Sequence, residues 1–307
     1  MSENTKTQQN DPYRIVKFLD AERGVRVAVV NATAAVREMQ QIQNAQPLAT
    51  MMVGRSIVGA ALLASQLKDG EVISVYFHGD GPIRTVFAES SFEGGVRGYT
   101  PHPELDLPLT PQGLDLKTAI GAGHLTVVRT HPNRTNSQKG TVPIQSGQIG
   151  DDIAFYLLQS QQIRSAIAVG VKLSPEGGVV AAGGILIELL PGADANIEVI
   201  VEDQFVRTGS ISEMFAAGKT PAEIAEDYLP VFNLKEIDHP YSVSYTCKCS
   251  KNRLLAAMEL FKDEDLKDIV DKKENPIAKC EFCGRQYTLE WSEVKDVLNR
   301  RLTGKLH

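Results

Sequence analysis

The chain has 307 residues, 42% hydrophobic and 23% charged, which is the composition of a globular protein with room for two domains. Its net charge of −6 disfavours a general nucleic-acid-binding protein, because such proteins need a basic surface to neutralise phosphates. Residues 1–11 are polar and lack the apolar run of a signal peptide, so we expect a disordered tail there and a cytoplasmic protein.

Residues 12–193 alternate strand and helix patterns. β-branched residues at every second position predict a strand at 24–33. An almost wholly apolar segment runs from Pro47, suited to a first helical turn, to Gly70, suited to a helix end, and predicts a buried central helix. We expect no membrane span here, because the apolar run is short and contains Arg55.

Further strands follow at 71–100, and the sequence HGDGP (78–82) between them predicts a turn. It does not predict a phosphate-binding loop, because no helix start follows it. Asp151 and Asp152 resemble a catalytic carboxylate pair, but capping and the dipole of a helix that begins near Asp151 explain two adjacent acids more simply. With strands at 177–192, the sequence predicts an α+β domain with antiparallel-rich sheets and the buried helix at its centre.

Charge separates three parts of the chain. Residues 1–193 carry a net charge of −1, residues 194–246 carry −7, and residues 247–307 carry +2. The sequence TPAE (220–223) offers Thr220 as an N-cap, with proline at the first helical position and a reciprocal glutamate. We therefore expect residues 12–193 to form one domain, followed by an acidic helical linker at 194–246. Few apolar residues hold the linker down, so we expect its local stability to be low.

The four cysteines of the chain form two pairs near its end. Cys247 and Cys249 are separated by one residue, and after 30 further residues Cys280 and Cys283 form a C-x-x-C pair followed by Gly284. A C-x-x-C-G turn brings two thiolates to one side, and alternation in an extended segment places the C-x-C thiolates on one face. Four such sulfurs fill the tetrahedral shell of a structural zinc ion, so we expect one Zn²⁺ on these four residues.

The size of the last part of the chain also favours a metal. Residues 247–307 are too few for a comfortable hydrophobic core. Structural zinc contributes on the order of 10–16 kcal/mol in small zinc peptides, which exceeds the usual stability of a domain this size. We therefore expect residues 247–307 to be a zinc-binding domain that loosens without its metal.

The same ligands can be oxidised, because zinc holds them as thiolates, the reactive form of sulfur. A disulfide within the C-x-x-C turn is geometrically easy. The C-x-C pair in an extended segment has a Cα separation of about 6.6 Å, near the upper limit for a disulfide, so closing it bends the chain. Oxidation would remove the ligands of the metal and loosen the adjoining linker, which is the behaviour of a redox switch.

These features resemble the redox-regulated 33 kDa chaperonin family of heat-shock proteins. The resemblance rests on the two cysteine pairs with their spacing and covers the chain from about Tyr13 to the last helix. Three further stretches carry it in the same order: GDGPI (79–83), SGQIGDD (146–152) and AAGGILIELLPG (181–192).

The resemblance implies an ATP-independent holdase chaperone of the cytoplasm that binds unfolded client proteins and is not an enzyme. It implies zinc on Cys247, Cys249, Cys280 and Cys283 in a reduced, largely inactive monomer. It further implies that oxidation by peroxide or hypochlorous acid, with heat, forms the disulfides Cys247–Cys249 and Cys280–Cys283, unfolds the linker and gives an active homodimer. Neither nucleic acid nor membrane is an expected partner, and no catalytic residue is expected.

Two other functions remain as alternatives at this point. A structural zinc module on a nucleic-acid-binding protein would use the net positive charge of 247–307, including Arg300 and Arg301. A thiol oxidoreductase would use Cys280 and Cys283 catalytically and would need a βαβ context around them. The sequence after Gly284 instead predicts a strand and then a helix that begins near Ser292.

Overall fold

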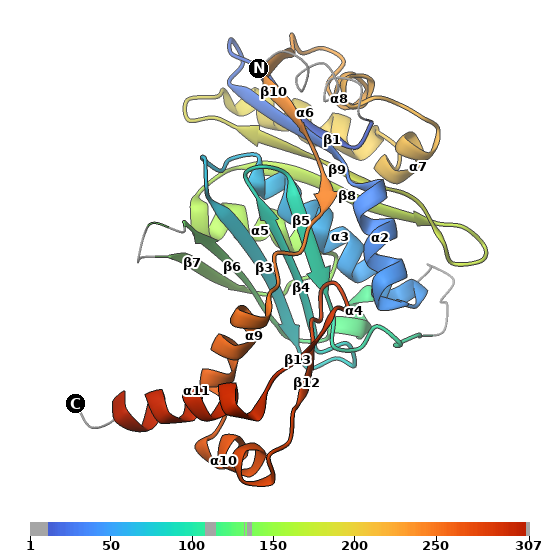
Figure 1. Cartoon of the computed structure of the whole chain (residues 1–307). Coiled ribbons are helices and arrows are strands. Elements are labelled where there is room, and N and C mark those ends of the chain that lie inside the picture. The colour runs from blue at the N-terminus through green and yellow to red at the C-terminus, as the bar shows by residue number, and fades with distance from the viewer. Residues whose placement is uncertain (1–11, 108–114, 132, 134–136, 305–307) are drawn as a thin grey trace, which may run out of the picture. The chain divides into compact units, whose positions relative to one another are not determined.

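The computed structural model describes residues 12–107, 115–131, 133 and 137–304 (Figure 1). The expected tail at 1–11 lies outside these residues. The chain divides into two compact units, Met1–Thr246 and Cys247–His307.

The first unit contains a five-stranded antiparallel sheet. Its strand order is β10 (Lys235–Ser242), β1 (Arg14–Asp20), β2 (Val25–Asn31), β9 (Val179–Leu189) and β8 (Ser165–Leu173). Strand β2 confirms the strand expected at 24–33. Strand β9 is buried on both faces, and a Cβ atom at Gly183 or Gly184 would lie within 2.6 Å of the Phe215 ring or the Val58 side chain. The two glycines therefore let helices approach the sheet closely.

A second sheet has six strands. Their order is β11 (Ser244–Tyr245), β5 (Gly95–Tyr99), β4 (Thr85–Ser91), β3 (Val72–Gly79), β6 (Gly123–Thr130) and β7 (Gln138–Pro143), and only the short β11–β5 pair is parallel. The segment HGDGP joins β3 to β4 as the expected turn. Asp80 accepts a hydrogen bond from the backbone N–H of Ala122 at 2.7 Å, and a Cβ at Gly81 would lie 2.5 Å from the carbonyl oxygen of Ala119.

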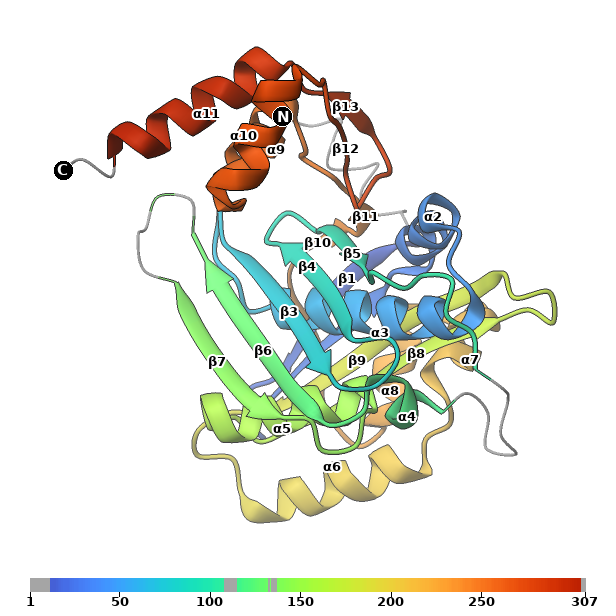
Figure 2. The same ribbon diagram turned by 90° about the horizontal axis from the view of Figure 1, so that it is seen from below.

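Helix α3 (Pro47–Ala64) packs against strands of both sheets, with α2 (Thr33–Gln43) and α5 (Ile149–Gln161) beside it (Figure 2). A short helix, α4 (Leu116–Ile120), precedes β6. These layers confirm the α+β fold with antiparallel-rich sheets and a buried central helix. The sequence predicts that this apolar run is too short to span a membrane. That prediction was wrong, because α3 is long and apolar enough to span one by length and composition alone. However, 83% of α3 is buried inside the protein. Packing between two sheets accounts for its apolar character.

Asp152 is fully buried at the start of α5, but it does not cap that helix. Its carboxylate accepts hydrogen bonds from the backbone N–H groups of Gln145 (2.8 Å), Ser146 (3.0 Å) and Gly147 (3.0 Å). The N-cap residue of α5 is Gln148, which makes no side-chain capping bond. Asp152 therefore closes the turn before the helix, and the expectation of helix capping was wrong for this residue. The other half of that expectation holds, because Asp151 and Asp152 both lie in the first turn of α5, where the helix dipole favours acidic residues.

The substitution Asp152→Ala is expected to destabilise the first unit by about 1–3 kcal/mol, because it leaves backbone N–H groups of this turn without an acceptor. A shift of the urea unfolding midpoint measures the loss. The matched control is Gln159→Ala, which changes an exposed residue of the same helix and should stay within about 0.5 kcal/mol of the parent. Equal effects of the two substitutions would contradict the role of Asp152 in the turn.

Residues 194–246 belong to the first unit and cover part of the five-stranded sheet. Helices α6 (Ala195–Arg207), α7 (Ile211–Ala216) and α8 (Pro221–Tyr228) come first, and α8 begins with the expected capping box of Thr220 and Glu223. Strands β10 and β11 follow, which the sequence analysis did not anticipate. The proline within KEIDHPYS argues against a central strand, and β10 is accordingly an edge strand.

The second unit is small. It contains α9 (Lys251–Ala257), a 3₁₀ turn (Met258–Leu260), α10 (Asp263–Lys272), a hairpin of β12 (Ile277–Lys279) and β13 (Gln286–Thr288), and α11 (Trp291–Gly304). Strand β13 and helix α11 confirm the strand and helix predicted after Gly284. Among its described residues, six buried side chains form the core cluster, and a few partly buried apolar side chains pack against them: the six are Met258, Leu266, Leu289, Val294, Val297 and Leu298.

Candidate metal centre

The C-x-C half of the site lies in an irregular segment between β11 and α9. Ser250 ends this segment as the N-cap of α9, and its side chain accepts a hydrogen bond from the backbone N–H of Arg253 at 3.3 Å. The Arg253 guanidinium in turn donates to the carbonyl oxygen of Lys248 at 2.9 Å. The first turn of α9 thus fixes the backbone between Cys247 and Cys249.

The C-x-x-C half of the site is the turn between β12 and β13. The backbone N–H of Gly284 donates to the carbonyl oxygen of Cys280 at 2.8 Å, and the N–H of Cys280 donates to that of Arg285 at 2.9 Å. Gly284 has φ of 69°, a left-handed conformation that suits glycine. This hairpin also differs from the βαβ context that a thioredoxin-like oxidoreductase would need.

The four sulfurs converge on one point. Sγ of Cys247 lies 3.6 Å from Sγ of Cys280, and Sγ of Cys249 lies 3.3 Å from Sγ of Cys283. All four sulfurs lie within 4.8 Å of one another, and all four cysteines are free thiols. Zn–S bonds of about 2.3 Å in a tetrahedron place sulfurs about 3.8 Å apart, so the donor set and its spacing fit a zinc ion. The structure therefore brings together every residue that the sequence analysis assigned to the metal.

The thiols differ in their surroundings. Burial and the neighbouring thiols raise the pKa of Cys247 to about 12. Burial also acts to raise the pKa of Cys249, but hydrogen bonds from Tyr287 and the other cysteines outweigh it and lower this pKa to about 7. Within the C-x-C pair, Cys249 therefore ionises more readily than Cys247.

Tyr287 was missed by the sequence analysis. Its hydroxyl lies 3.2 Å from Sγ of Cys249, across the space between the two halves of the site. A strand pattern places Tyr287 in β13, but it gives no sign that the ring reaches back to a cysteine 38 residues earlier.

Comparison with known proteins identifies the family that shares these features. The model of the Hsp33 protein family matches residues 14–290, which is most of the chain. The chain belongs to the Hsp33 family. It is 34% identical to the 33 kDa chaperonin of Aquifex aeolicus over 96% of this chain and 94% of that protein. It is 35% identical to the 33 kDa chaperonin of Limosilactobacillus fermentum over 92% of this chain and 97% of that protein.

A solved structure supports the same family. The crystal structure of the 33 kDa chaperonin (heat shock protein 33 homologue) of Thermotoga maritima superposes with a TM-score of 0.82 at 27% identity, covering 95% of this chain and 99% of that one. The resemblance found in the sequence is thus confirmed. The protein is thus a member of the Hsp33 family of chaperones, and the curated relatives that it matches are named 33 kDa chaperonins.

In this Hsp33-family chain the helices α6 to α8 are fastened to the sheet by buried apolar side chains. Ile211, Phe215, Ile224 and Tyr228 are at most 8% exposed and join a cluster with the outward-facing residues of β1, β2 and β9. Tyr228 packs its ring 5.4 Å from that of Phe205 on α6. The expectation that few apolar residues hold this region underestimated its packing.

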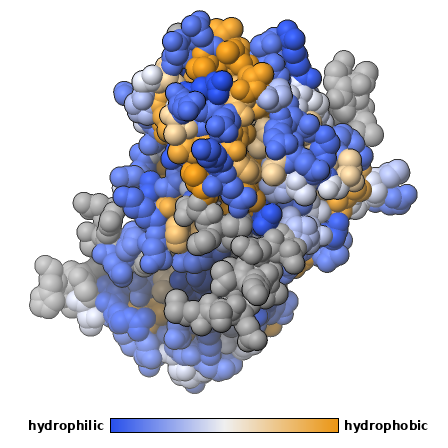
Figure 3. Space-filling model, turned by 90° about the horizontal axis from the view of Figure 1, so that it is seen from above, coloured by the Kyte–Doolittle hydropathy of each residue, from blue (hydrophilic) through white to orange (hydrophobic). Residues whose placement is uncertain are grey.

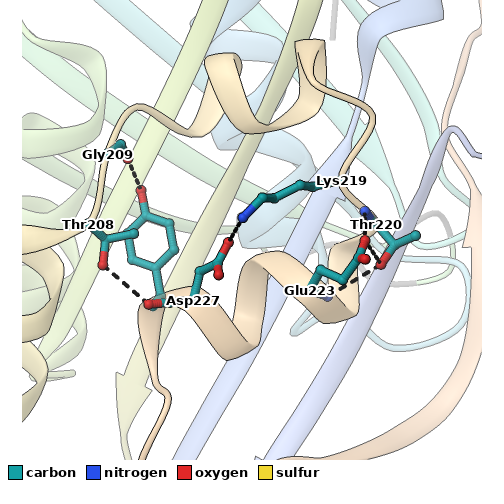
Figure 4. A network of polar contacts seen from close by, with 7 residues as sticks. Thr208, Gly209, Lys219, Thr220, Glu223 and Asp227 are labelled. Carbon is teal, nitrogen blue, oxygen red and sulfur yellow. Dashed lines mark hydrogen bonds and ion pairs between the residues drawn. The ribbon is translucent and has the colours of Figure 1, made fainter.

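A polar network connects the same helices (Figure 4). The Tyr228 hydroxyl donates to the carbonyl oxygen of Gly209 at 3.2 Å, and burial raises the pKa of Tyr228 to about 12. Thr208 donates to the carbonyl oxygen of Asp227 at 3.4 Å, and the Asp227 carboxylate pairs with Lys219. The network ties both ends of α7 to α8, so these short helices should undock together.

Exposed apolar side chains also occur on helix α6. Seen from above, apolar surface gathers in one broad area of the first unit (Figure 3). On α6, which lies on that side in Figure 1, Val199 is 64% exposed and Val206 is 84% exposed.

Proposed function

We propose that this chain is a redox-regulated, ATP-independent holdase chaperone of the cytoplasm. In the reduced state Cys247, Cys249, Cys280 and Cys283 hold one zinc ion, and the protein is a largely inactive monomer. In the oxidised state two disulfides replace the metal site, the helices α6 to α8 undock, and a homodimer binds unfolding proteins. The observation that carries the proposal is the convergence of four free thiols from two half-sites within 4.8 Å.

The chemistry of the switch follows from the sulfurs. Zinc, when bound, keeps the four sulfurs as thiolates and ties the two half-sites together. With hydrogen peroxide as oxidant, one thiolate attacks an oxygen of the O–O bond and becomes a sulfenic acid, and the hydroxide that leaves takes a proton from solvent to become water. The second cysteine of the pair then attacks this sulfur, so that an S–S bond forms and a second water leaves.

Loss of the thiolates has a structural consequence. A disulfide sulfur carries no charge for a metal, so oxidation of Cys247–Cys249 and Cys280–Cys283 removes the ligands of the site. Without the metal, the core cluster of the second unit must keep 61 residues folded, and its six buried side chains among the described residues are a smaller core than a domain usually needs. The C-x-C pair adjoins Thr246, the last residue of the first unit, so its bending acts directly on the chain that follows β10 and β11.

Undocked linker helices would supply the client-binding surface. Phe215, Ile224 and Tyr228 are buried while the helices lie on the sheet, and undocking exposes both their side chains and the apolar residues of β2 and β9 beneath them. Unfolding proteins expose apolar segments that such a surface can bind through the hydrophobic effect.

The test is protection of a client protein that unfolds on heating, followed by light scattering without nucleotide. We expect the oxidised chain to suppress aggregation and the reduced, zinc-loaded chain to leave it nearly unchanged. Treatment of the oxidised chain with a thiol reductant and zinc should restore the inactive state. Equal protection by both states would contradict the redox switch, and protection by neither would contradict the holdase function.

A further inference from the structure

Tyr287 connects the two halves of the metal centre. It lies in β13, paired with Ala278 of β12, so its position is fixed by the hairpin that carries Cys280 and Cys283 (Figure 2). Its hydroxyl nevertheless lies beside the other half-site, 3.2 Å from Sγ of Cys249 and 3.2 Å from the carbonyl oxygen of the same residue. One phenol therefore joins the hairpin to the C-x-C segment through its oxygen.

A second group directs this hydroxyl. Nη1 of Arg285, two residues earlier in the chain, donates a hydrogen bond to the Tyr287 oxygen at 3.4 Å. Because Arg285 supplies this hydrogen, the phenolic hydrogen of Tyr287 is free to point at Cys249. The hydroxyl of Tyr287 has two possible acceptors there, a neutral carbonyl oxygen and a sulfur. The sulfur becomes the stronger acceptor once it is a thiolate, because hydrogen bonds to charged acceptors are stronger than those to neutral ones.

Packing alone does not account for the hydroxyl. The Tyr287 ring packs against the small core of the second unit, a role that a phenylalanine ring would fill equally well. The hydroxyl is the part that reaches Cys249. Groups that hydrogen-bond to a metal ligand orient it, and their removal typically costs 10–100-fold in metal affinity or activity.

We propose that Tyr287 is a positioning residue of the metal centre, whose hydroxyl donates to the Cys249 thiolate, holds that sulfur in place and slows its reaction with oxidants. The proposal rests on the proposed function, because it assumes that zinc binds these cysteines and that their oxidation activates the chain. A hydrogen bond from the phenol draws charge from the thiolate and so lowers its nucleophilicity toward the O–O bond of a peroxide. Cys249 is then oxidised to a sulfenic acid with loss of one water, and Cys247 closes the disulfide with loss of the second.

The experiment compares the full-length chain with Tyr287→Phe, which removes only the hydroxyl. Zinc affinity is measured by competition with a chromophoric chelator, and thiol oxidation is followed by free-thiol titration after addition of hydrogen peroxide. We expect zinc to bind about 10–100-fold more weakly in the variant and the oxidation half-time to shorten. Far-UV circular dichroism at saturating zinc should not change, because the ring and the core remain.

Two further variants sharpen the result. Tyr156→Phe is the matched control, because it removes a hydroxyl that accepts from Gln161 in the first unit, and it should change neither readout. Arg285→Ala should shift both readouts in the same direction as Tyr287→Phe, and the double variant should be no worse than Tyr287→Phe alone. If Tyr287→Phe does not fold with zinc, Arg285→Ala tests the proposal by the same two measurements, and unchanged zinc affinity and oxidation half-time in that variant contradict it.

The proposal is overturned if Tyr287→Phe retains zinc within twofold of the parent chain and is oxidised at the same rate. That outcome leaves the proposed function intact, provided that the parent binds zinc and gains client protection on oxidation. A parent chain that binds no zinc would instead overturn the proposed function, and this inference with it.

Discussion

Removal of zinc from the reduced chain is expected to unfold residues 247–307 and to leave the first unit folded. Among the residues that the structure describes, the core cluster of the second unit has six buried side chains, whereas structural zinc contributes on the order of 10–16 kcal/mol in small zinc peptides. The first unit has two sheets around a buried helix and needs no metal for its core. Hydrogen exchange followed by mass spectrometry measures the difference, with α10 and α11 losing protection and β9 keeping it.

Two substitutions separate metal loss from other effects of the chelator. Cys280→Ser removes the most buried ligand and should reproduce the loss of protection without any chelator. Glu281→Ala changes the exposed residue next to it and should leave protection in the second unit unchanged. Continued protection of α10 and α11 in the zinc-free chain would show that the small core suffices, and it would remove the structural basis of the switch.

The parts of this fold that local chemistry specifies could be predicted from the sequence. Thr220, Pro221 and Glu223 carry the local signature of a capping box, and the structure has it. The two cysteine pairs likewise carry their geometry in their spacing, because an extended segment of three residues, or a turn of four, places both sulfurs on one side. The structure brings these four sulfurs together as that spacing indicates.

The parts that depend on distant contacts could not be predicted. Asp152 looks like a helix-capping residue in the sequence, but tertiary packing turns its carboxylate toward the N–H groups of the preceding turn. Strand β10 exists because β1 offers it a partner more than 200 residues earlier in the chain. The Tyr287 hydroxyl contacts Cys249 only because the β12–β13 hairpin folds against the C-x-C segment. No periodicity or motif encodes such contacts.

The docking of the linker helices depends on the same kind of distant contact, and it can be weakened at one residue. Tyr228 is 2% exposed, packs against Phe205 and donates to Gly209. The substitution Tyr228→Ala is expected to destabilise the docked state of α8 by about 3–5 kcal/mol, because it leaves a cavity where a large ring was buried. Hydrogen exchange of residues 221–229 in the reduced, zinc-loaded chain measures the change.

This variant also tests whether linker docking keeps the chain inactive. If undocking exposes the client-binding surface, reduced Tyr228→Ala should protect a heat-unfolding client almost as well as the oxidised parent. Tyr228→Phe loses only the bond to Gly209, worth about 0.5–1.5 kcal/mol, and should protect weakly. Glu226→Ala, an exposed change on the same helix, should behave like the parent. Faster exchange in α8 without any gain in protection would show that the metal centre acts on clients by a route other than these helices.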